Sequence, residues 1–207
     1  MQLFEFPPTR SIRVRWVLQE LGADFAAIRV DLRAGDHRRP EFLKLNPAGK
    51  VPVLVDGDIV LTESVAICLY LADKFPEKGL LPSDLALRAQ VHRWLFFAAT
   101  ELEQPLWRIS RNGFLYAEAD RQPGDIVNAR RDFKEMAAVV DEHLRGREFL
   151  VGERVSIADF VMAYTLDWGG EAGLLADSPT LCAYVERMYA RPQAAPRIAV
   201  ALASIQS

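Results

Sequence analysis

The chain has 207 residues, of which 50% are hydrophobic and 26% charged, a composition typical of folded globular proteins and not of disordered or fibrous ones. At this length it can bury one large core or two modest ones. The formal net charge of −3 gives no general attraction to nucleic acid or to an anionic membrane, so neither is expected as a partner.

The first half predicts two short strands, residues 2–6 and 26–32, separated by a helix whose apolar residues recur at i, i+3, i+4 and i+7 (Val14, Val17, Leu18 and Leu21). Such a unit implies a parallel pair of strands joined by a right-handed crossover. Residues 51–56 and 59–63 flank Asp56-Gly57-Asp58, a turn suited to an antiparallel hairpin. A helix over 64–75 follows, so the predicted order is βαβ and then ββα.

From Leu85 onward only helical patterns occur. Residues 86–107 and 125–144 are both helical, and the second has one apolar face formed by Ile126, Phe133, Met136, Ala137, Val140 and Leu144. Ser156 stands three residues before Asp159, a capping box, and Val155 and Phe160 form a hydrophobic staple around it. We therefore predict an α/β domain over 1–77, a linker over 78–86 and an all-α domain over 87–207.

The N-terminus begins on the strand-like stretch MQLFEF, without a basic segment or a long apolar run. This pattern predicts neither a secretory signal nor a transmembrane span, and therefore a cytoplasmic protein. Cys68 and Cys182 lie far apart in helical patterns, which favours two buried, reduced thiols over a disulfide. The sequence has no CxxC motif and no His/Cys cluster, so no metal site is expected.

Three motifs, NPAGKVPVL (46–54), LTESVAICLYL (61–71) and SIADF (156–160), follow one another on this pattern of elements. In order and spacing they resemble those of cytosolic glutathione transferases, of a bacterial type with a serine- or threonine-like N-terminal turn, over nearly the whole chain. The resemblance implies a thioredoxin-like N-terminal domain, an all-α C-terminal domain, glutathione as co-substrate and a role in detoxification. It also implies a homodimer in which the first half of each chain packs on the second half of the other.

Two of the motifs carry the expected glutathione site. Val51 precedes Pro52 and is pushed toward an extended backbone; the resemblance implies a cis Pro52, which leaves the Val51 N–H and C=O to pair with a tripeptide as a strand would. Pro52 at the start of a strand is the simpler alternative. Glu63 and Ser64 lie where a strand meets a helix N-terminus, which binds carboxylates well. The resemblance places the α-carboxylate of the γ-glutamyl group on Ser64 and its ammonium near Glu63, whereas a plain helix cap is the alternative.

The glycine carboxylate of glutathione has two expected partners. By resemblance, Lys50 is one, and His37 could assist from the preceding loop. Arg33, Arg38 and Arg39 make that loop locally basic, and a solvated charged loop explains these residues equally well.

The turn FPPTRSIRVRW (6–16) is where members of this family hold the group that contacts the glutathione thiol. It contains neither cysteine nor tyrosine, and the resemblance puts Thr9 at or next to the serine position and Arg10 at the cysteine position. A hydroxyl donor, a helix N-terminus and a guanidinium all stabilise a thiolate. We expect Thr9 first and then Ser11 to donate, with Arg10 or Arg13 as the cation, although Thr9 also suits a simple N-cap.

The second substrate is expected to contact the helical half. The segment ELEQPLWRISRNGFLYAE and a later helix supply an aromatic and cationic set, Trp107, Arg108, Arg111, Phe114, Tyr116 and Trp168. At least half of these are expected to be core packing.

The sequence thus predicts a glutathione transferase that holds the thiolate and adds it to a small apolar or aromatic electrophile. A glutathione-dependent disulfide reductase or isomerase of the maleylacetoacetate type is the first alternative, and the absence of a serine-serine-cysteine turn counts against the isomerase. A non-catalytic ligand- or protein-binding relative is the second.

Overall fold

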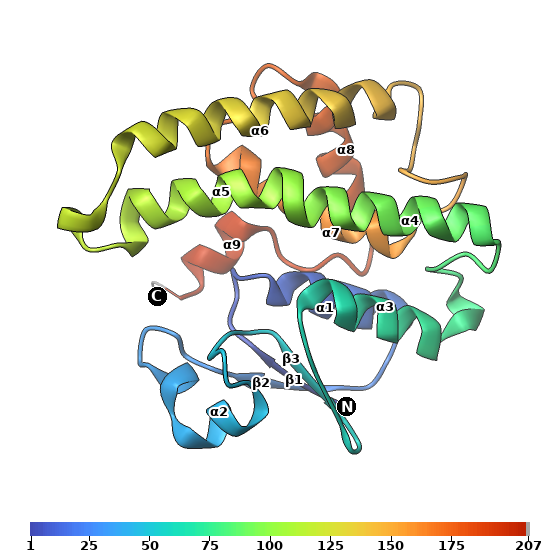
Figure 1. Ribbon diagram of the computed structural model, residues 1–207. Coiled ribbons are helices and arrows are strands. Elements are labelled where there is room, and N and C mark those ends of the chain that lie inside the picture. Colours follow the sequence, from blue (N-terminus) through green and yellow to red (C-terminus); the bar gives the residue numbers. More distant parts are fainter. Residues whose placement is uncertain (206–207) are drawn as a thin grey trace. The chain divides into compact units, whose positions relative to one another are not determined.

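The computed structural model describes residues 1–205, drawn as a ribbon in Figure 1. By their internal contacts the residues form two compact units: Met1–Leu81 together with the segment from Tyr189 onward, and Pro82–Met188. The C-terminal segment, expected as part of the helical domain, therefore groups with the first unit. The expected boundaries at 77 and 87 remain a prediction.

A four-stranded sheet organises the first unit. Its strands are β1 (Gln2–Glu5), β2 (Ala26–Arg29), β3 (Val53–Asp56) and β4 (Ile59–Thr62), in the order β2-β1-β3-β4. β1 pairs with β2 in parallel and with β3 antiparallel, and β3 and β4 form the antiparallel hairpin. The parallel pair and the hairpin predicted from the sequence are both confirmed.

The pairing register brings three chain segments to one edge of this sheet. Phe4, near the end of β1, is opposite Val53, the first residue of β3, and Val53 is opposite Thr62, the last residue of β4. At the same edge of the sheet, therefore, the chain leaves β1, enters β3 and leaves β4.

Two helices of the first unit pack on each other, α1 (Ser11–Leu21) and α3 (Ser64–Lys74) (Figure 1). All four residues of the predicted apolar face of α1 are buried, and Gly22 ends the helix in the left-handed conformation that glycine adopts without steric cost. A short helix not predicted from the sequence, α2 (Pro40–Leu45), follows a 3₁₀ turn at Asp36–Arg38. At six residues α2 is too short to show helical periodicity, and it is held by Phe42, which packs with Val30 and Val53.

Tyr189 and Arg191 attach the C-terminal segment to α1. The Arg191 guanidinium donates two hydrogen bonds of 2.7 Å to the Glu20 carboxylate, which also accepts the Trp16 indole N–H at 3.2 Å. The Trp16 and Tyr189 rings lie 4.6 Å apart between centroids. These contacts explain why the segment that carries α9 (Ile198–Ala203) belongs to the first unit.

The second unit is helical. It contains α4 (Leu85–Phe97), α5 (Glu103–Ser110), α6 (Pro123–Leu144), α7 (Ile157–Glu171) and α8 (Pro179–Tyr189). The predicted helix over 86–107 is α4, a π-helical turn at Ala98–Leu102 and the start of α5. α6 runs alongside α5 in Figure 1, and it buries the predicted face except for Ile126 and Met136, which are half-buried. Among residues 1–205, no helix is long and apolar enough to cross a membrane.

The two cysteines differ in exposure. Both are free, and Cys68 on α3 is buried, so that desolvation raises the pKa of its thiol to about 12. Cys182 on α8 is exposed, which makes the prediction of two buried thiols wrong for this residue. The reason is that Cys182 falls between buried Leu181 and Tyr184 on the outer side of an amphipathic helix.

The predicted capping box at the start of α7 is confirmed. The Ser156 N–H and hydroxyl donate to one oxygen of Asp159 at 2.9 and 3.0 Å, and the Leu150 N–H and Tyr184 hydroxyl donate to the other at 2.9 Å each. Asp159 is fully buried, and this desolvation raises the pKa of its carboxyl, an effect that the four hydrogen bonds oppose. One carboxylate thus joins the loop before α7, the start of α7 and α8.

We expect Asp159→Ala to lower the free energy of unfolding by about 2–4 kcal/mol, because several buried donors lose their acceptor at once. Equilibrium unfolding in urea measures this loss. Asp177→Ala is the matched control, because Asp177 is 88% exposed and pairs with the exposed Lys134. A loss for Asp159→Ala no larger than that of the control would contradict the role of the buried carboxylate.

Candidate functional site

The turn between β1 and α1 is closed by its own backbone and by two hydroxyls. The Thr9 N–H donates to the Phe6 carbonyl at 3.0 Å, and the Ile12 N–H donates to the Thr9 carbonyl at 3.1 Å. The Thr9 and Ser11 hydroxyl oxygens lie 2.9 Å apart. The Pro7–Pro8 peptide bond in this turn is cis.

The hydrogen bonds of these hydroxyls distinguish Thr9 from Ser11. Ser11 is fully buried and its oxygen accepts the Phe6 N–H at 3.3 Å, whereas Thr9 is half-buried and accepts the Ser11 N–H at 3.3 Å. When Ser11 donates its proton to Thr9, the Thr9 proton is left for an acceptor outside the turn. Of the two hydroxyls, Thr9 is thus the more accessible one. Arg10 occupies the N-cap position of α1 and is also half-buried.

The segment before β3 is held by Asn46, a residue that the sequence analysis did not single out. Its side-chain amide donates to the Lys50 carbonyl at 2.7 Å and its Oδ1 accepts the Ala48 N–H at 3.0 Å. The Gly49 N–H closes the turn on the Asn46 carbonyl at 2.9 Å. The signal in the sequence was an asparagine directly before a proline, with a glycine three residues on, since asparagine commonly bonds the backbone two residues on.

Val51, which follows this turn, has an open backbone. The Val51–Pro52 bond is cis, as expected, and Val51 is half-buried. Within residues 1–205, neither its N–H nor its carbonyl makes a hydrogen bond to another backbone group. The Val51 main chain can therefore pair with an extended peptide.

The loop that carries His37 approaches Gly49, the residue before Lys50, closely. Gly49 has φ +62°, and a Cβ there would lie 3.0 Å from the His37 carbonyl oxygen and 3.3 Å from an Arg38 guanidinium nitrogen. Lys50 is exposed, and His37 is half-buried with an Nδ1 atom that has no hydrogen-bond partner in the described part of the chain. The two predicted partners of a glycine carboxylate therefore lie on adjoining loops.

The first part of the candidate site is the turn between β1 and α1, and the second is the segment before β3. The end of β4 and the start of α3 form the third part. Ser64 is the first residue of α3 and is 5% exposed, and Glu63 before it is exposed with φ 67° and ψ 111°. A non-glycine residue in such a conformation costs on the order of 1–3 kcal/mol, and such strain collects at functional sites. Glu63 is the N-cap residue of α3, and within residues 1–205 its side chain makes no capping hydrogen bond.

Arg13 joins this third part to α1. Its side chain is 1% exposed, and Nη1 donates to the Ser64 hydroxyl oxygen at 3.3 Å. Arg13 is predicted from the sequence as a cation near the thiol, whereas the structure places it beside Ser64. A charged residue on the apolar face of α1 was the signal, because buried arginine requires partners.

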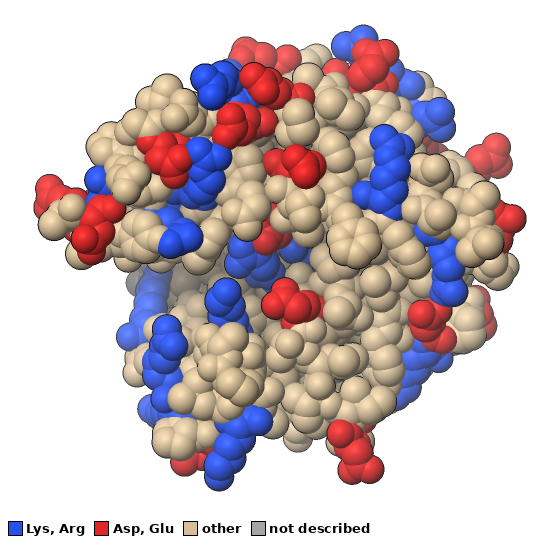
Figure 2. Space-filling view, in the orientation of Figure 1, with Lys and Arg blue, Asp and Glu red and all other residues tan. Residues whose placement is uncertain are grey.

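Positive charge gathers near these loops. Figure 2 shows Lys and Arg side chains over α2 and the loop before it, and the exposed residues of this stretch include Arg33, Arg38, Arg39, Lys44 and Lys50. Arg39 pairs with Asp36 at 2.8 Å, and Arg33 donates to the Ile205 carbonyl at 3.0 Å. Among residues 1–205, no group of three or more His, Cys, Asp or Glu side chains is arranged to hold a metal ion.

In the helical unit, the structure brings together three of the six residues predicted to contact a second substrate. Arg108, Arg111 and Tyr116 line a hollow of about 210 Å³ with Asn112, Gln122 and Asp125, and we call it the Arg111 hollow. Trp107 and Trp168 are half-buried and do not line it, and Phe114 is 68% exposed.

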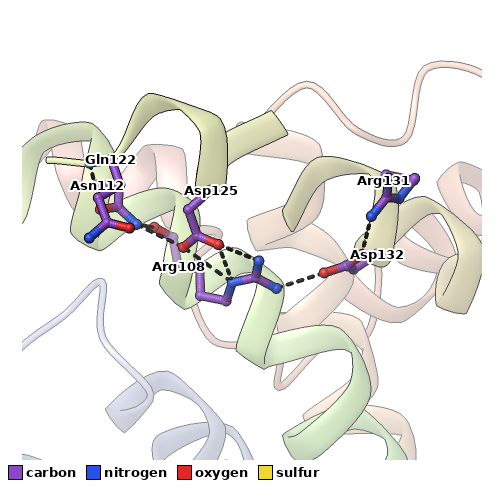
Figure 3. Close-up of polar contacts among 6 residues, drawn as sticks. All are labelled: Arg108, Asn112, Gln122, Asp125, Arg131 and Asp132. Carbon is purple, nitrogen blue, oxygen red and sulfur yellow. Dashed lines mark hydrogen bonds and ion pairs between the residues drawn. The ribbon is translucent and has the colours of Figure 1, made fainter. Parts of the chain in front are cut away.

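Two aspartates bind the Arg108 guanidinium (Figure 3). Its guanidinium binds Asp125 through Nε and Nη2, and its Nη1 donates to Asp132 at 2.6 Å. Hydrogen bonding to Arg108 lowers the pKa of Asp125. Arg108 therefore joins α5 to α6, and its charge is already neutralised.

Comparison with known proteins matches both units. The model of the "Glutathione S-transferase, N-terminal domain" matches residues 1–73 and that of the "Glutathione S-transferase, C-terminal domain" matches residues 90–192. Glutathione S-transferase F10 of Arabidopsis thaliana is 34% identical over 183 residues, 84% of this chain and 85% of that protein.

Solved structures agree. A sphingomonad glutathione S-transferase complexed with glutathione has a TM-score of 0.83 and 32% identity, covering 99% of this chain and 98% of that one. A Burkholderia graminis glutathione transferase with two glutathione molecules bound per subunit has a TM-score of 0.84 and 26% identity, covering 98% and 87%.

Gly49→Ala tests the turn that joins the two loops. We expect it to lower the free energy of unfolding by about 1–3 kcal/mol, because alanine is strained at positive φ and its Cβ meets the His37 carbonyl. Gly35→Ala is the matched control, since Gly35 also has positive φ, +80°, but a Cβ there meets nothing within 4 Å. Thermal unfolding of the two variants should therefore differ, and equal losses would mean that the close approach at Gly49 is unimportant.

Proposed function

Because the chain belongs to the glutathione S-transferase family, we propose that it binds glutathione as a thiolate and transfers it to a small electrophilic, apolar or aromatic molecule. The observation that carries the proposal is that one sheet edge supplies the Thr9 turn, the open Val51 backbone and the start of α3. The first offers a donor to a thiol, the second a strand partner and the third a carboxylate site.

The γ-glutamyl end of glutathione is proposed to bind at the start of α3. Arg13 donates to the Ser64 oxygen, so the Ser64 proton points to another acceptor. That proton, the Ser64 N–H and the positive end of the helix dipole suit a carboxylate. The exposed Glu63 carboxylate then pairs with the ammonium group of the same residue.

The remaining glutathione backbone is proposed to extend along Val51. Its N–H and carbonyl would pair with the cysteinyl residue of the tripeptide, as an added strand pairs with a sheet edge. Lys50 and His37 would then take the glycine carboxylate, in the locally basic surroundings of α2.

Thr9 is proposed as the group that stabilises the thiolate. A free thiol has a pKa of about 8.5 and is largely protonated at neutral pH. The Thr9 hydroxyl, oriented by Ser11, donates to sulfur, and the N-terminus of α1 and the Arg10 charge favour the anion. The thiol proton passes to solvent, and sulfur then forms a bond to the electrophilic carbon as the leaving group departs.

The second substrate is proposed to contact the helical unit. Arg111 and Tyr116 are the leading candidates for this contact, because they line the hollow. Trp107, Phe114 and Trp168 remain proposed contacts. Arg108 is proposed to position its neighbours, because its donors are already used. Proximity of the two bound reactants would supply much of the rate.

A glutathione-dependent disulfide reductase is the second candidate. The Burkholderia relative with two bound glutathione molecules favours it, since a disulfide reductase must hold two thiol-bearing groups. The same Thr9 hydroxyl would serve both reactions by stabilising a thiolate. We also propose that the protein forms a homodimer, as the resemblance implies, and that it acts in the cytoplasm.

The proposed role of Thr9 is tested by measuring the pKa of the bound glutathione thiol. The ultraviolet absorbance of the thiolate, followed as a function of pH, gives this pKa. We expect a pKa at least about one unit below that of a free thiol, because donors favour the anion. Thr9→Ala should return the pKa toward the free value, while Thr9→Ser, which keeps the hydroxyl, should retain the shift. Binding without a lowered pKa would overturn the thiolate proposal, and a shift retained in Thr9→Ala would assign it to other groups.

The two reactions are separated by two assays on the same protein. The transferase proposal expects chloride displacement from 1-chloro-2,4-dinitrobenzene, in which the C–S bond forms as the C–Cl bond breaks. The reductase proposal expects glutathione to attack the mixed disulfide of glutathione and 2-hydroxyethanethiol. This attack releases 2-hydroxyethanethiol as the free thiol and forms glutathione disulfide. Activity in the second assay alone would replace the transferase by the reductase.

A further inference from the structure

The Arg111 hollow is built around a π-helical turn. Arg111–Leu115 follows α5 in this conformation, and the Tyr116 N–H donates to the Arg111 carbonyl five residues earlier at 2.9 Å. The turn sets the Arg111 guanidinium over the Tyr116 ring, 4.5 Å from the ring centroid. Single π-helical turns are often found at functional sites because they re-aim side chains.

Asn112, another lining residue of the hollow, is fixed by its hydrogen bonds. This residue is 8% exposed, and its amide donates to Asp125 at 3.0 Å and to the Arg108 carbonyl at 3.1 Å. Its Oδ1 accepts the Gln122 N–H at 3.1 Å, which fastens the chain just before α6 (Figure 3). The hollow therefore has a preformed shape.

Arg111 differs from Arg108 in its partners. Both oxygens of Asp125 are used by Arg108 and Asn112. Within residues 1–205, the Arg111 guanidinium makes no hydrogen bond or ion pair; it stacks on the Tyr116 ring, and its positive charge also helps to lower the pKa of Asp125. Stacking uses the face of the guanidinium and leaves the N–H groups along its edge for a planar acceptor.

We propose that the Arg111 hollow binds the carboxylate of a single-ring aromatic acid, so that the electrophile of the proposed transferase is an aromatic carboxylate; this rests on the proposed function. A carboxylate matches the guanidinium edge with two parallel hydrogen bonds. A single guanidinium without an ion-pair partner, beside the negative charge of Asp125, favours a monoanion over a doubly charged phosphate. The volume of about 210 Å³ suits a molecule smaller than a drug-sized ligand, and an aromatic ring continues the stack on Tyr116.

The reaction tested is displacement of chloride from 4-chloro-3-nitrobenzoate. The glutathione sulfur bonds to the ring carbon that carries chlorine, chloride leaves with the electron pair of the broken bond, and the thiol proton goes to solvent. The matched neutral probe is 4-chloro-3-nitrobenzamide. For each probe, kcat/KM is divided by its uncatalysed rate constant with glutathione, which removes the difference in ring reactivity.

We expect the normalised kcat/KM of the full-length protein to favour the benzoate by about tenfold, the factor typical of one charge-assisted hydrogen-bonded pair. Arg111→Gln should remove this preference, and Arg111→Lys should restore part of it, because lysine keeps the charge without the planar fork. Arg130→Gln, an exposed arginine on α6, is the control and should retain the preference. No benzoate preference, or one that persists in Arg111→Gln, would overturn the inference.

Direct binding separates this inference from the proposed function. Saturation-transfer NMR with 3-nitrobenzoate, which has no leaving group, reports on the hollow without any reaction. Binding that Arg111→Gln abolishes, in a protein that conjugates no chlorinated probe, would support the acid site while the transferase fails. Conjugation of the benzamide without Arg111-dependent binding of 3-nitrobenzoate would leave the transferase and overturn the acid site. Circular dichroism of Arg111→Gln, with Tyr116→Leu as a second variant, excludes loss of fold as the cause.

Discussion

The candidate glutathione site depends on the register of the sheet. Phe4, Val53 and Thr62 are aligned across β1, β3 and β4, and each is at or near the end of its strand on the same edge. Leu3 of β1 and Leu54 of β3 are directly paired and both fully buried, so a slip of β3 by one residue would turn Leu54 to the other face, and the apolar core therefore fixes the register strongly. The same apolar contacts that stabilise the unit therefore also hold the three segments of the site together.

Buried polar groups set the direction of the site's donors. Arg13 donates to Ser64, Ser11 lies under Thr9, and Asn46 holds the chain before Val51. In the proposed reaction none of these three touches the reacting sulfur. Each satisfies part of the hydrogen-bonding capacity of a neighbour, and the unused proton or lone pair of that neighbour then faces a ligand. Preorganisation of this kind reduces the cost of ordering the site when a ligand binds.

The helical unit uses two arginines one turn apart in opposite ways. Arg108 is hydrogen-bonded to Asp125 and Asp132 and joins two helices, whereas Arg111 rests on an aromatic ring. Their residue type and spacing in the sequence gave no means of telling them apart. The difference comes from the π-helical turn and from the aspartates that α6 places near Arg108 but not within bonding distance of Arg111.

The sequence by itself determined the strands, the α1 and α3 helices, the capping box and the motifs that identify the family, because these depend on local periodicity and on residues close in the chain. It did not reveal α2, which is too short for a pattern, or the exposure of Cys182, which depends on what covers α8. It also could not show that Arg13 lies beside Ser64, 51 positions away, or that the segment from Tyr189 joins the first unit. These features depend on contacts between distant residues, and such contacts are decided only when the chain packs into its tertiary structure.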